Sequence, residues 1–218
     1  MTGDIRVVNV DIPGPEGLLE GLINTRTEPN GAQSRAIAVL AHPLPTRGGT
    51  LHTKAVFHAA KALARIGVPV LRFNFRGVGR SVGTFSDGVG EQDDCRAALA
   101  FMKARYPEVK RIWCGGMSFG SWVAMTAGAA DPDVTALIGI ACPVTKYDYS
   151  TVVAAARPTF LVHGERDELI PVKEIRKFYA TLPEPKELVV IDAADHLFDG
   201  KASEVGDAIE DLLQDFND

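Results

Sequence analysis

The chain has 218 residues, and 46% of them are hydrophobic, which is enough to bury the core of one ordinary domain. A formal net charge of −5, with basic residues scattered along the sequence, disfavours a nucleic-acid-binding surface. No apolar run is long enough to span a bilayer, and the first residues lack the hydrophobic stretch of a signal peptide. We therefore expect a single domain over residues 1–218, in the cytoplasm, with neither nucleic-acid nor membrane partners.

Cysteine and histidine spacing bears on redox state and metal binding. Cys95, Cys114 and Cys142 show no CxxC spacing, and the last two fall within apolar segments, so we expect reduced thiols. The sequence contains no HExxH, no Walker A motif and no paired Cys/His ligands. We expect neither a metal nor an organic cofactor.

Hydrophobic periodicity predicts strands that alternate with helices. Two early strands, 6–10 and 18–24, flank a turn rich in Pro and Gly and are expected to form a hairpin. Later strands are predicted over 36–41, 68–75, 111–114, 135–141, 159–162 and 187–191. Helices are predicted over 54–66, 91–105, after residue 118, over 150–156, from 171 onwards and from 205 to 216. This alternation predicts a mostly parallel sheet with helices on both faces.

The most informative motif is Gly116-Met117-Ser118-Phe119-Gly120, which lies between an apolar strand and a segment of small, helix-compatible residues. The two glycines allow a tight turn without a Cβ clash, so the serine hydroxyl is presented outward. This setting predicts that Ser118 is a nucleophile.

A serine nucleophile needs a base, and the base needs a carboxylate to orient it. Asp167 and His196 each come just after the C-terminal end of a predicted strand, as Ser118 does. In open α/β sheets, ligand chemistry takes place at that edge. We therefore expect the three side chains to converge, with His196 as the base.

Acyl transfer also needs donors for the oxyanion of the tetrahedral intermediate. One expected donor is the backbone N–H of Phe119, which follows the nucleophile. The second should come from the loop after the strand 36–41. Pro43 and Pro45 of that loop have no N–H, so Leu44 between them is the candidate. The preceding His42 is expected to brace the loop and to act as neither acid nor base.

Together these segments resemble the α/β-hydrolase superfamily, and within it the small, single-domain bacterial serine hydrolases related to dienelactone hydrolases and carboxylesterases. The matching segments are 40–43 with 48–49, 73–81, 116–120, 163–167 and 195–196. The resemblance implies the α/β-hydrolase fold, with about eight strands, and a triad in the order Ser118, Asp167, His196. Dienelactone hydrolases proper carry cysteine where this chain has Ser118, so their lactone substrate is not implied.

The identity of the orienting carboxylate has alternatives. Glu165 and Glu168 are near neighbours of Asp167, and Asp148 follows the preceding strand, where some hydrolases keep their acid. Asp167 is preferred because its segment resembles the family pattern H-G-x-x-D-x-x-[VI]-P. His163, which opens that segment, is expected to tighten the turn rather than serve as a second base.

In lipases and many esterases, a cap domain follows the strand that corresponds to residues 135–141. Here only residues 143–158 precede the next strand, which leaves room for one short helix. We expect no cap domain and an open pocket that accepts small or short-chain acyl groups. The expected pocket walls are Leu44, Phe119, Tyr147, Tyr149 and Phe198.

These features predict a cofactor-free serine hydrolase that cleaves carboxylic esters of small or short-chain acyl groups through an acyl-enzyme. Thioesterase or peptidase activity on the same residues is the alternative among hydrolases. A ligand-binding protein that keeps the fold without catalysis is the alternative from another class. The partner is then a small molecule, and the chain is expected to be a monomer or a small homo-oligomer.

Overall fold

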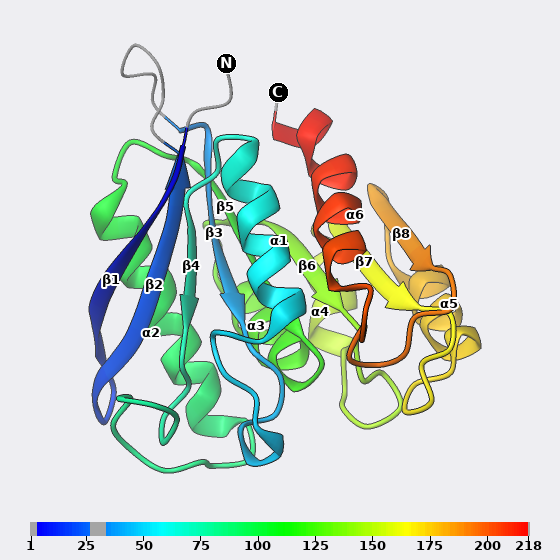
Figure 1. Cartoon of the computed structure of the whole chain (residues 1–218), viewed down its shortest axis with the longest axis horizontal. Helices are drawn as coiled ribbons and strands as arrows, with labels where there is room; N and C mark the ends of the chain where they lie inside the picture. The colour runs from blue at the N-terminus through cyan, green and yellow to red at the C-terminus, as the bar shows by residue number, and fades with distance from the viewer. Residues whose placement is uncertain (1–3, 27–33, 218) are drawn as a thin grey trace.

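The structure, a computed structural model, describes residues 4–26 and 34–217. Its centre is a sheet of eight strands in the order β1-β2-β4-β3-β5-β6-β7-β8 (Figure 1). The strands are β1 (Ile5–Gly14), β2 (Gly17–Arg26), β3 (Ala36–Ala41), β4 (Val70–Phe73), β5 (Arg111–Met117), β6 (Val134–Ile140), β7 (Thr159–Gly164) and β8 (Lys186–Ile191). The six strands β3 to β8 are parallel to one another. Strands β1 and β2 form an antiparallel hairpin, and β2 pairs antiparallel with β4.

Helices cover both faces of the sheet. They are α1 (Lys54–Arg65), α2 (Val89–Arg105), α3 (Phe119–Ala130), α4 (Ser150–Ala155), α5 (Val172–Thr181) and α6 (Ala202–Gln214), with short 3₁₀ turns η2 (Pro45–Arg47) and η3 (Asp215–Asn217). Helices α1 and α6 pack together on one face, and α2 to α5 lie on the other (Figure 1).

Each face of the sheet has its own hydrophobic core. Along β3, Ile37 and Val39 pack toward α2 and α3, whereas Ala38 and Leu40 pack toward α1 and α6. This alternation follows from the two-residue period of a strand. Since both faces are covered, β3 is hydrophobic and buried at every position, as is typical of a central strand in a parallel sheet.

The observed architecture confirms the predicted fold class. The sheet is mostly parallel, it is covered on both faces, and the expected hairpin is present, although its strands are longer than predicted. Between β6 and β7 the chain holds only the six-residue helix α4, so there is no cap domain. Cys95, Cys114 and Cys142 are buried and free.

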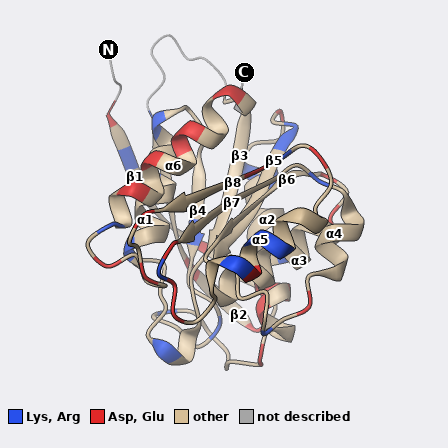
Figure 2. Cartoon of the chain, turned by 90° about the vertical axis from the view of Figure 1, so that its right-hand side faces the viewer, with Lys and Arg blue, Asp and Glu red and all other residues tan. Residues whose placement is uncertain are grey.

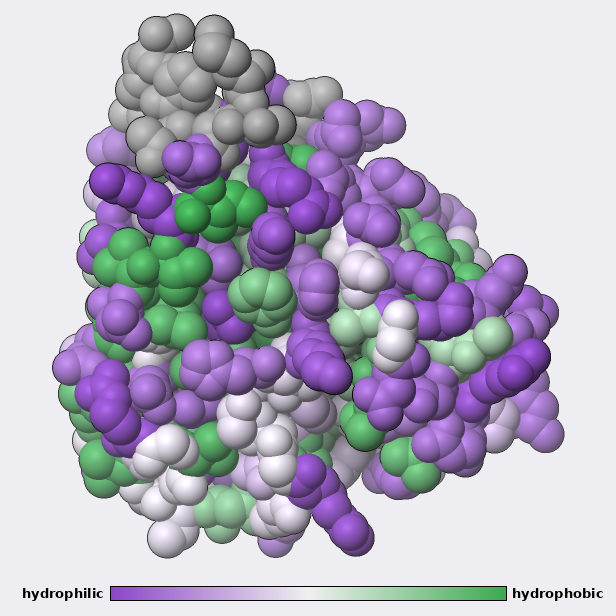
Figure 3. All heavy atoms as spheres, viewed as in Figure 1, coloured by the Kyte–Doolittle hydropathy of each residue, from purple (hydrophilic) through white to green (hydrophobic). Residues whose placement is uncertain are grey.

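The surface is mixed in character. Basic and acidic side chains are interspersed, and acidic residues recur along α6 (Figure 2). Hydrophilic atoms predominate on the face in Figure 3, while hydrophobic atoms gather over the β1–β2 hairpin, which carries the exposed Val7 and Val8. Among the helices of residues 4–26 and 34–217, none is long and apolar enough to cross a membrane.

Candidate active site

Ser118 occupies the sharp turn between β5 and α3. Its backbone has φ 51° and ψ −126°, a conformation that costs a non-glycine residue about 1–3 kcal/mol and persists only where the surroundings fix it. The glycines on either side are required by close approach of the β3 end: a Cβ at Gly116 would lie 2.6 Å from the carbonyl oxygen of Ala41, and one at Gly120 would lie 2.2 Å from that of His42.

The structure brings Ser118, His196 and Asp167 into one hydrogen-bonded chain. The Ser118 hydroxyl lies 2.9 Å from Nε2 of His196, and Nδ1 of His196 lies 2.7 Å from Oδ2 of Asp167. A carboxylate accepts but cannot donate, so Nδ1 carries the hydrogen and Nε2 of the neutral ring is free to accept the hydroxyl proton. The three residues follow β5, β8 and β7, whose C-terminal ends lie at the same edge of the sheet.

Asp167 is a buried carboxylate that its partners keep ionised. Burial alone would raise its pKa, but the hydrogen bonds from His196 and from the N–H of Ile170 outweigh burial and hold the pKa below its usual value. Its Oδ1 accepts from the N–H groups of Leu169 and Ile170 at 2.9 and 2.8 Å. The carboxylate is therefore fixed by the turn that carries it.

The alternative carboxylates have other partners. Asp148 is exposed and accepts from the N–H and hydroxyl of Ser150, the first residue of α4, at 2.8 and 2.7 Å. Glu165 accepts from the N–H of Ala193 at 2.9 Å. Among the carboxylates of the described residues, only that of Asp167 forms a hydrogen bond with the imidazole of His196.

His163 supports the same turn. Its Nε2 donates to the carbonyl oxygen of Ile170 at 2.8 Å, and burial lowers its pKa, so the ring is neutral. Its Nδ1 is buried and has no hydrogen-bond partner among the described residues. Its Nε2 also lies 3.7 Å from Oδ2 of Asp167, so His163 contacts the carboxylate while it braces the turn.

The loop after β3 carries the second expected amide. Leu44 accepts from the N–H groups of Arg47 and Gly49, both at 3.1 Å, which closes the loop around η2. A Cβ at Gly49 would lie 2.0 Å from the carbonyl oxygen of Pro43, so only glycine permits this closure. The N–H of Leu44 forms no hydrogen bond within the described part of the chain, and that of Phe119, at the first position of α3, has no acceptor within the helix.

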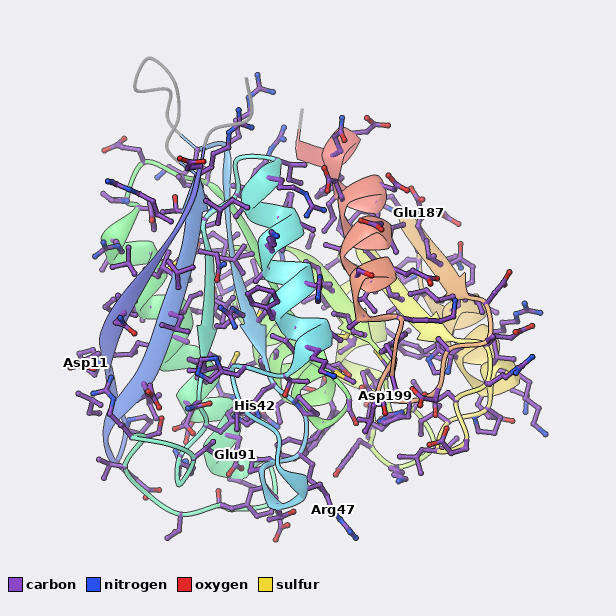
Figure 4. All side chains as sticks on the ribbon, in the orientation of Figure 1. Asp11, His42, Arg47, Glu91, Glu187 and Asp199 are labelled. Carbon is purple, nitrogen blue, oxygen red and sulfur yellow. The ribbon has the colours of Figure 1, made fainter. Side chains whose placement is uncertain are left out.

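His42 ties this loop to the sheet. Its Nδ1 donates to the carbonyl oxygen of Pro43 at 2.7 Å, and its Nε2 accepts from the N–H of Phe75 at 3.1 Å. The ring lies inside the fold near the end of β3, whereas Arg47 extends outward from the rim (Figure 4). Burial lowers the pKa of His42 to about 4, so the ring is neutral at physiological pH.

The end of the loop between β3 and α1, at Leu51, is bonded to side chains in and just after β4. This anchor was not predicted from the sequence. The buried Arg72 donates to the carbonyl oxygen of Leu51 at 2.5 Å, and the Asn74 side chain accepts from the N–H of Leu51 at 2.8 Å. A buried arginine within an apolar strand is the sequence signal that could have pointed to this anchor, since such a group needs acceptors.

A cavity of about 540 Å³ opens over Ser118. Its walls include Leu44, Phe119 and Tyr147, as expected, together with Leu169, Ile170 and Leu197, which were not predicted. Charged residues also line it: the basic Arg47 and Lys146 and the acidic Glu168.

Two expected wall residues lie elsewhere, which corrects the sequence-based prediction. The loop turns sharply after His196, so Leu197 is 55% exposed and Phe198, with φ 56°, is wholly buried in the core beneath α1 and α6. Tyr149 is also buried: its ring packs on Phe178 with centroids 5.0 Å apart, beneath α4 and α5.

The fold and this arrangement define the class of the protein as that of the α/β serine hydrolases. Residues 32–157, more than half of the chain, match the family model described as serine aminopeptidase, S33. An uncharacterized protein of Rickettsia prowazekii, RP471, is 36% identical over 208 residues, which cover 92% of this chain and 86% of RP471. The chain belongs to this S33 family of the α/β-hydrolase superfamily.

Two solved structures are similar over nearly the whole chain. XC6422 from Xanthomonas campestris, described as an α/β serine hydrolase without a lid, is 34% identical with a TM-score of 0.87, covering 97% of this chain and 95% of its own. An α/β serine hydrolase homologue from Coxiella burnetii is 35% identical with a TM-score of 0.84, covering 94% of this chain and 97% of its own. The lidless description agrees with the short β6–β7 segment seen here.

The burial of His42 predicts a pH-dependent stability. An unfolded chain takes up a proton on His42 below its ordinary pKa of 6.5, whereas the folded chain does so only near pH 4. The unfolded state therefore binds more protons between these values, and stability falls by about 3 kcal/mol as the pH drops through this window.

Urea unfolding at pH 7 and pH 4.5 measures this effect. In His42→Gln, which keeps a donor and an acceptor, the loss of stability between the two pH values should shrink by about 2–3 kcal/mol. His52→Gln, at an exposed position, is the matched control and should keep the loss of the unmodified protein. If His42→Gln lost as much stability between pH 7 and pH 4.5 as the unmodified protein, the buried ring would not be the cause of the pH dependence.

Proposed function

We propose that the protein is a carboxylesterase that cleaves esters of small or short-chain acyl groups through an acyl-enzyme on Ser118. The observation that carries this proposal is the chain of contacts from Ser118 to His196 at 2.9 Å and from His196 to Asp167 at 2.7 Å, at the base of an open cavity. Each group has the geometry that its role in a Ser-His-Asp triad requires.

In the first half of the reaction, Ser118 Oγ attacks the ester carbonyl carbon while His196 Nε2 takes the hydroxyl proton. The resulting imidazolium is stabilised by the ionised Asp167. The tetrahedral intermediate collapses when His196 returns the proton to the departing alcohol, which leaves an acyl-enzyme. Water then attacks the acyl group with His196 as base, and the acid leaves with Ser118 restored.

The oxyanion of each intermediate would be held by the backbone N–H groups of Leu44 and Phe119. Both residues line the cavity beside Ser118, and both amides lack an acceptor among the described residues. Each preorganised donor of this kind contributes about 100- to 1,000-fold in kcat. An oxyanion donor at Leu44 has to be held in a fixed position. The bonds of His42 at the start of the loop after β3 and of Arg72 at its end supply that support.

Thioesterase or peptidase activity remains the alternative within this chemistry, since thioesters and amides pass through the same tetrahedral intermediate. The S33 family model, named for aminopeptidases, favours including amino-acyl amides among the substrates tested. A binding protein without catalysis is disfavoured because the hydroxyl, imidazole and carboxylate are in bonding contact, which a binding site does not require.

Replacement of the nucleophile tests the proposal. Ser118→Ala removes the attacking oxygen, and hydrolysis of p-nitrophenyl acetate should fall by at least about 1,000-fold and by as much as 10⁶-fold. Stoichiometric labelling of Ser118 by a fluorophosphonate should be lost with it. Ser203→Ala, at an exposed position on α6, is the control and should match the unmodified protein. Undiminished hydrolysis by Ser118→Ala would exclude the mechanism.

A pair of isosteric replacements identifies the orienting carboxylate. Asp167→Asn leaves the side-chain shape but removes the acceptor that fixes the His196 tautomer, so kcat should fall by about 10⁴-fold. Asp148→Asn changes only an exposed contact with Ser150 at the start of α4, and kcat should stay within about twofold of the unmodified value. Steady-state kinetics on one ester compares the two, and the assignment of Asp167 is wrong if Asp148→Asn shows the larger loss.

The open cavity predicts a preference for short acyl groups. With no cap to cover a long chain, acyl carbons beyond those held in the cavity stay in water and add little binding energy. The value of kcat/KM should be higher for p-nitrophenyl acetate and butyrate than for the palmitate, with no rise in rate at a lipid interface. Faster cleavage of the palmitate would contradict this prediction.

A further inference from the structure

Next to Ser118, and outside the lining of the cavity, lie two buried hydroxyl groups that the proposed mechanism does not use. Ser121, in the first turn of α3, is wholly buried, and Tyr149, just before α4, is 5% exposed. The Ser121 hydroxyl lies 2.6 Å from the carbonyl oxygen of Ser118 and 3.0 Å from the hydroxyl of Tyr149. The three groups form a continuous row.

The direction of hydrogen bonding along this row is fixed by the number of protons. The Ser118 carbonyl can only accept, so Ser121 donates its single hydrogen to it. In the contact between the two hydroxyls, the Ser121 oxygen then accepts from Tyr149, and the buried Cys142 thiol also lies within hydrogen-bonding reach of both. Burial raises the pKa of Tyr149 well above its usual value of 10, so the phenol keeps the proton that it donates. The donors therefore point in one direction, from Tyr149 through Ser121 to Ser118.

The end of this row is the peptide group that carries the N–H of Phe119. In a trans peptide the C=O and the following N–H lie in one plane and point in opposite directions. The Ser118 carbonyl faces Ser121, so the Phe119 N–H of the same peptide points away from it. The carbonyl also accepts from the N–H groups of Ser121 and Trp122, at 2.8 and 3.4 Å, so the plane is held by several bonds.

We propose that Ser121 and Tyr149 are positioning residues that orient and polarise the Phe119 amide as the oxyanion donor. This inference rests on the proposed hydrolase function. Hydrogen bonds in a chain strengthen one another because each donation polarises the next group. A carbonyl that accepts strongly makes the N–H of the same peptide a better donor. Tyr149 thus contributes from beneath the nucleophile rather than as a wall of the pocket.

Polarisation of the Phe119 amide should stabilise the transition state more than the bound substrate, because the oxyanion carries its charge only in the transition state. Loss of a whole oxyanion donor lowers kcat by about 100- to 1,000-fold. Each bond in a chain changes the strength of its neighbour by about 10–30%, and that fraction of the donor's effect is roughly 2- to 8-fold for Ser121, which bonds the peptide directly. Tyr149 is one bond further away, so its effect is at most about 2-fold. A purely structural role for the same hydroxyls would change stability and leave kcat as it was.

Tyr149→Phe is the decisive variant, because it removes one oxygen atom and keeps the ring that packs on Phe178. We expect a small but measurable fall in kcat for p-nitrophenyl acetate, at most about 2-fold, with KM unchanged. The inhibition constant of an alkyl trifluoromethyl ketone, whose adduct with Ser118 carries an oxyanion, should weaken by the same factor as kcat. Tyr179→Phe is the control, since it removes a hydroxyl bonded to the Lys186 carbonyl at 3.3 Å, away from the cavity.

Ser121→Ala breaks the row at its centre and supplies an independent readout. Its loss of kcat should exceed that of Tyr149→Phe, and the double variant should lose no more than Ser121→Ala alone, because Tyr149 acts through Ser121. Should Ser121→Ala fail to fold, Tyr149→Phe by itself decides the question.

The inference is overturned if Tyr149→Phe shifts the unfolding midpoint while kcat and the inhibition constant stay at the values of the unmodified protein. A double variant whose loss equals the product of the two single losses would also overturn it. These failures differ from failure of the proposed function, in which the unmodified protein neither hydrolyses esters nor reacts with a fluorophosphonate. In that case both proposals fall.

Discussion

The backbone contact between the end of β3 and the turn at Ser118 determines how the rest of the site is arranged. Strand order places β3 beside β5, and the absence of side chains at Gly116 and Gly120 lets the carbonyl oxygens of Ala41 and His42 approach that turn closely. A methyl group at either glycine would push the two segments apart. The loop after β3 would then no longer meet the start of α3, and the oxyanion site proposed for the amides of Leu44 and Phe119 would be lost.

Electrostatics in the site follows from how each ionisable group is buried. Asp167 is buried with enough donors to remain charged. Burial lowers the pKa of His42 and of His163 and so favours the neutral ring, although their hydrogen bonds to backbone carbonyls act in the opposite direction. A single negative charge is therefore directed at Nδ1 of His196, with no competing buried cation in the hydrogen-bonded chain. This is the environment in which an imidazolium can form transiently beside the reacting group.

Much of the fold and the core of the site could be predicted from the sequence, because both depend on repeated patterns. Apolar runs followed by polar loops mark parallel strands, and parallel strands end at one edge, so Ser118, Asp167 and His196 could be placed together before any coordinates were known. The orientations of Tyr149 and Phe198 could not, since each depends on the backbone angles of an irregular loop. The anchoring of Leu51 by Arg72 and Asn74 likewise joins segments whose pairing no local pattern encodes.

The brevity of the segment between β6 and β7 has a consequence for the time course of the proposed reaction. With only α4 in this stretch, the segment between β6 and β7 supplies no folded piece that has to swing aside before reactant enters or acid departs. Exchange with solvent is then a matter of diffusion through a permanent opening. Bond making and breaking at the serine, rather than a conformational gate, would set the pace of each cycle.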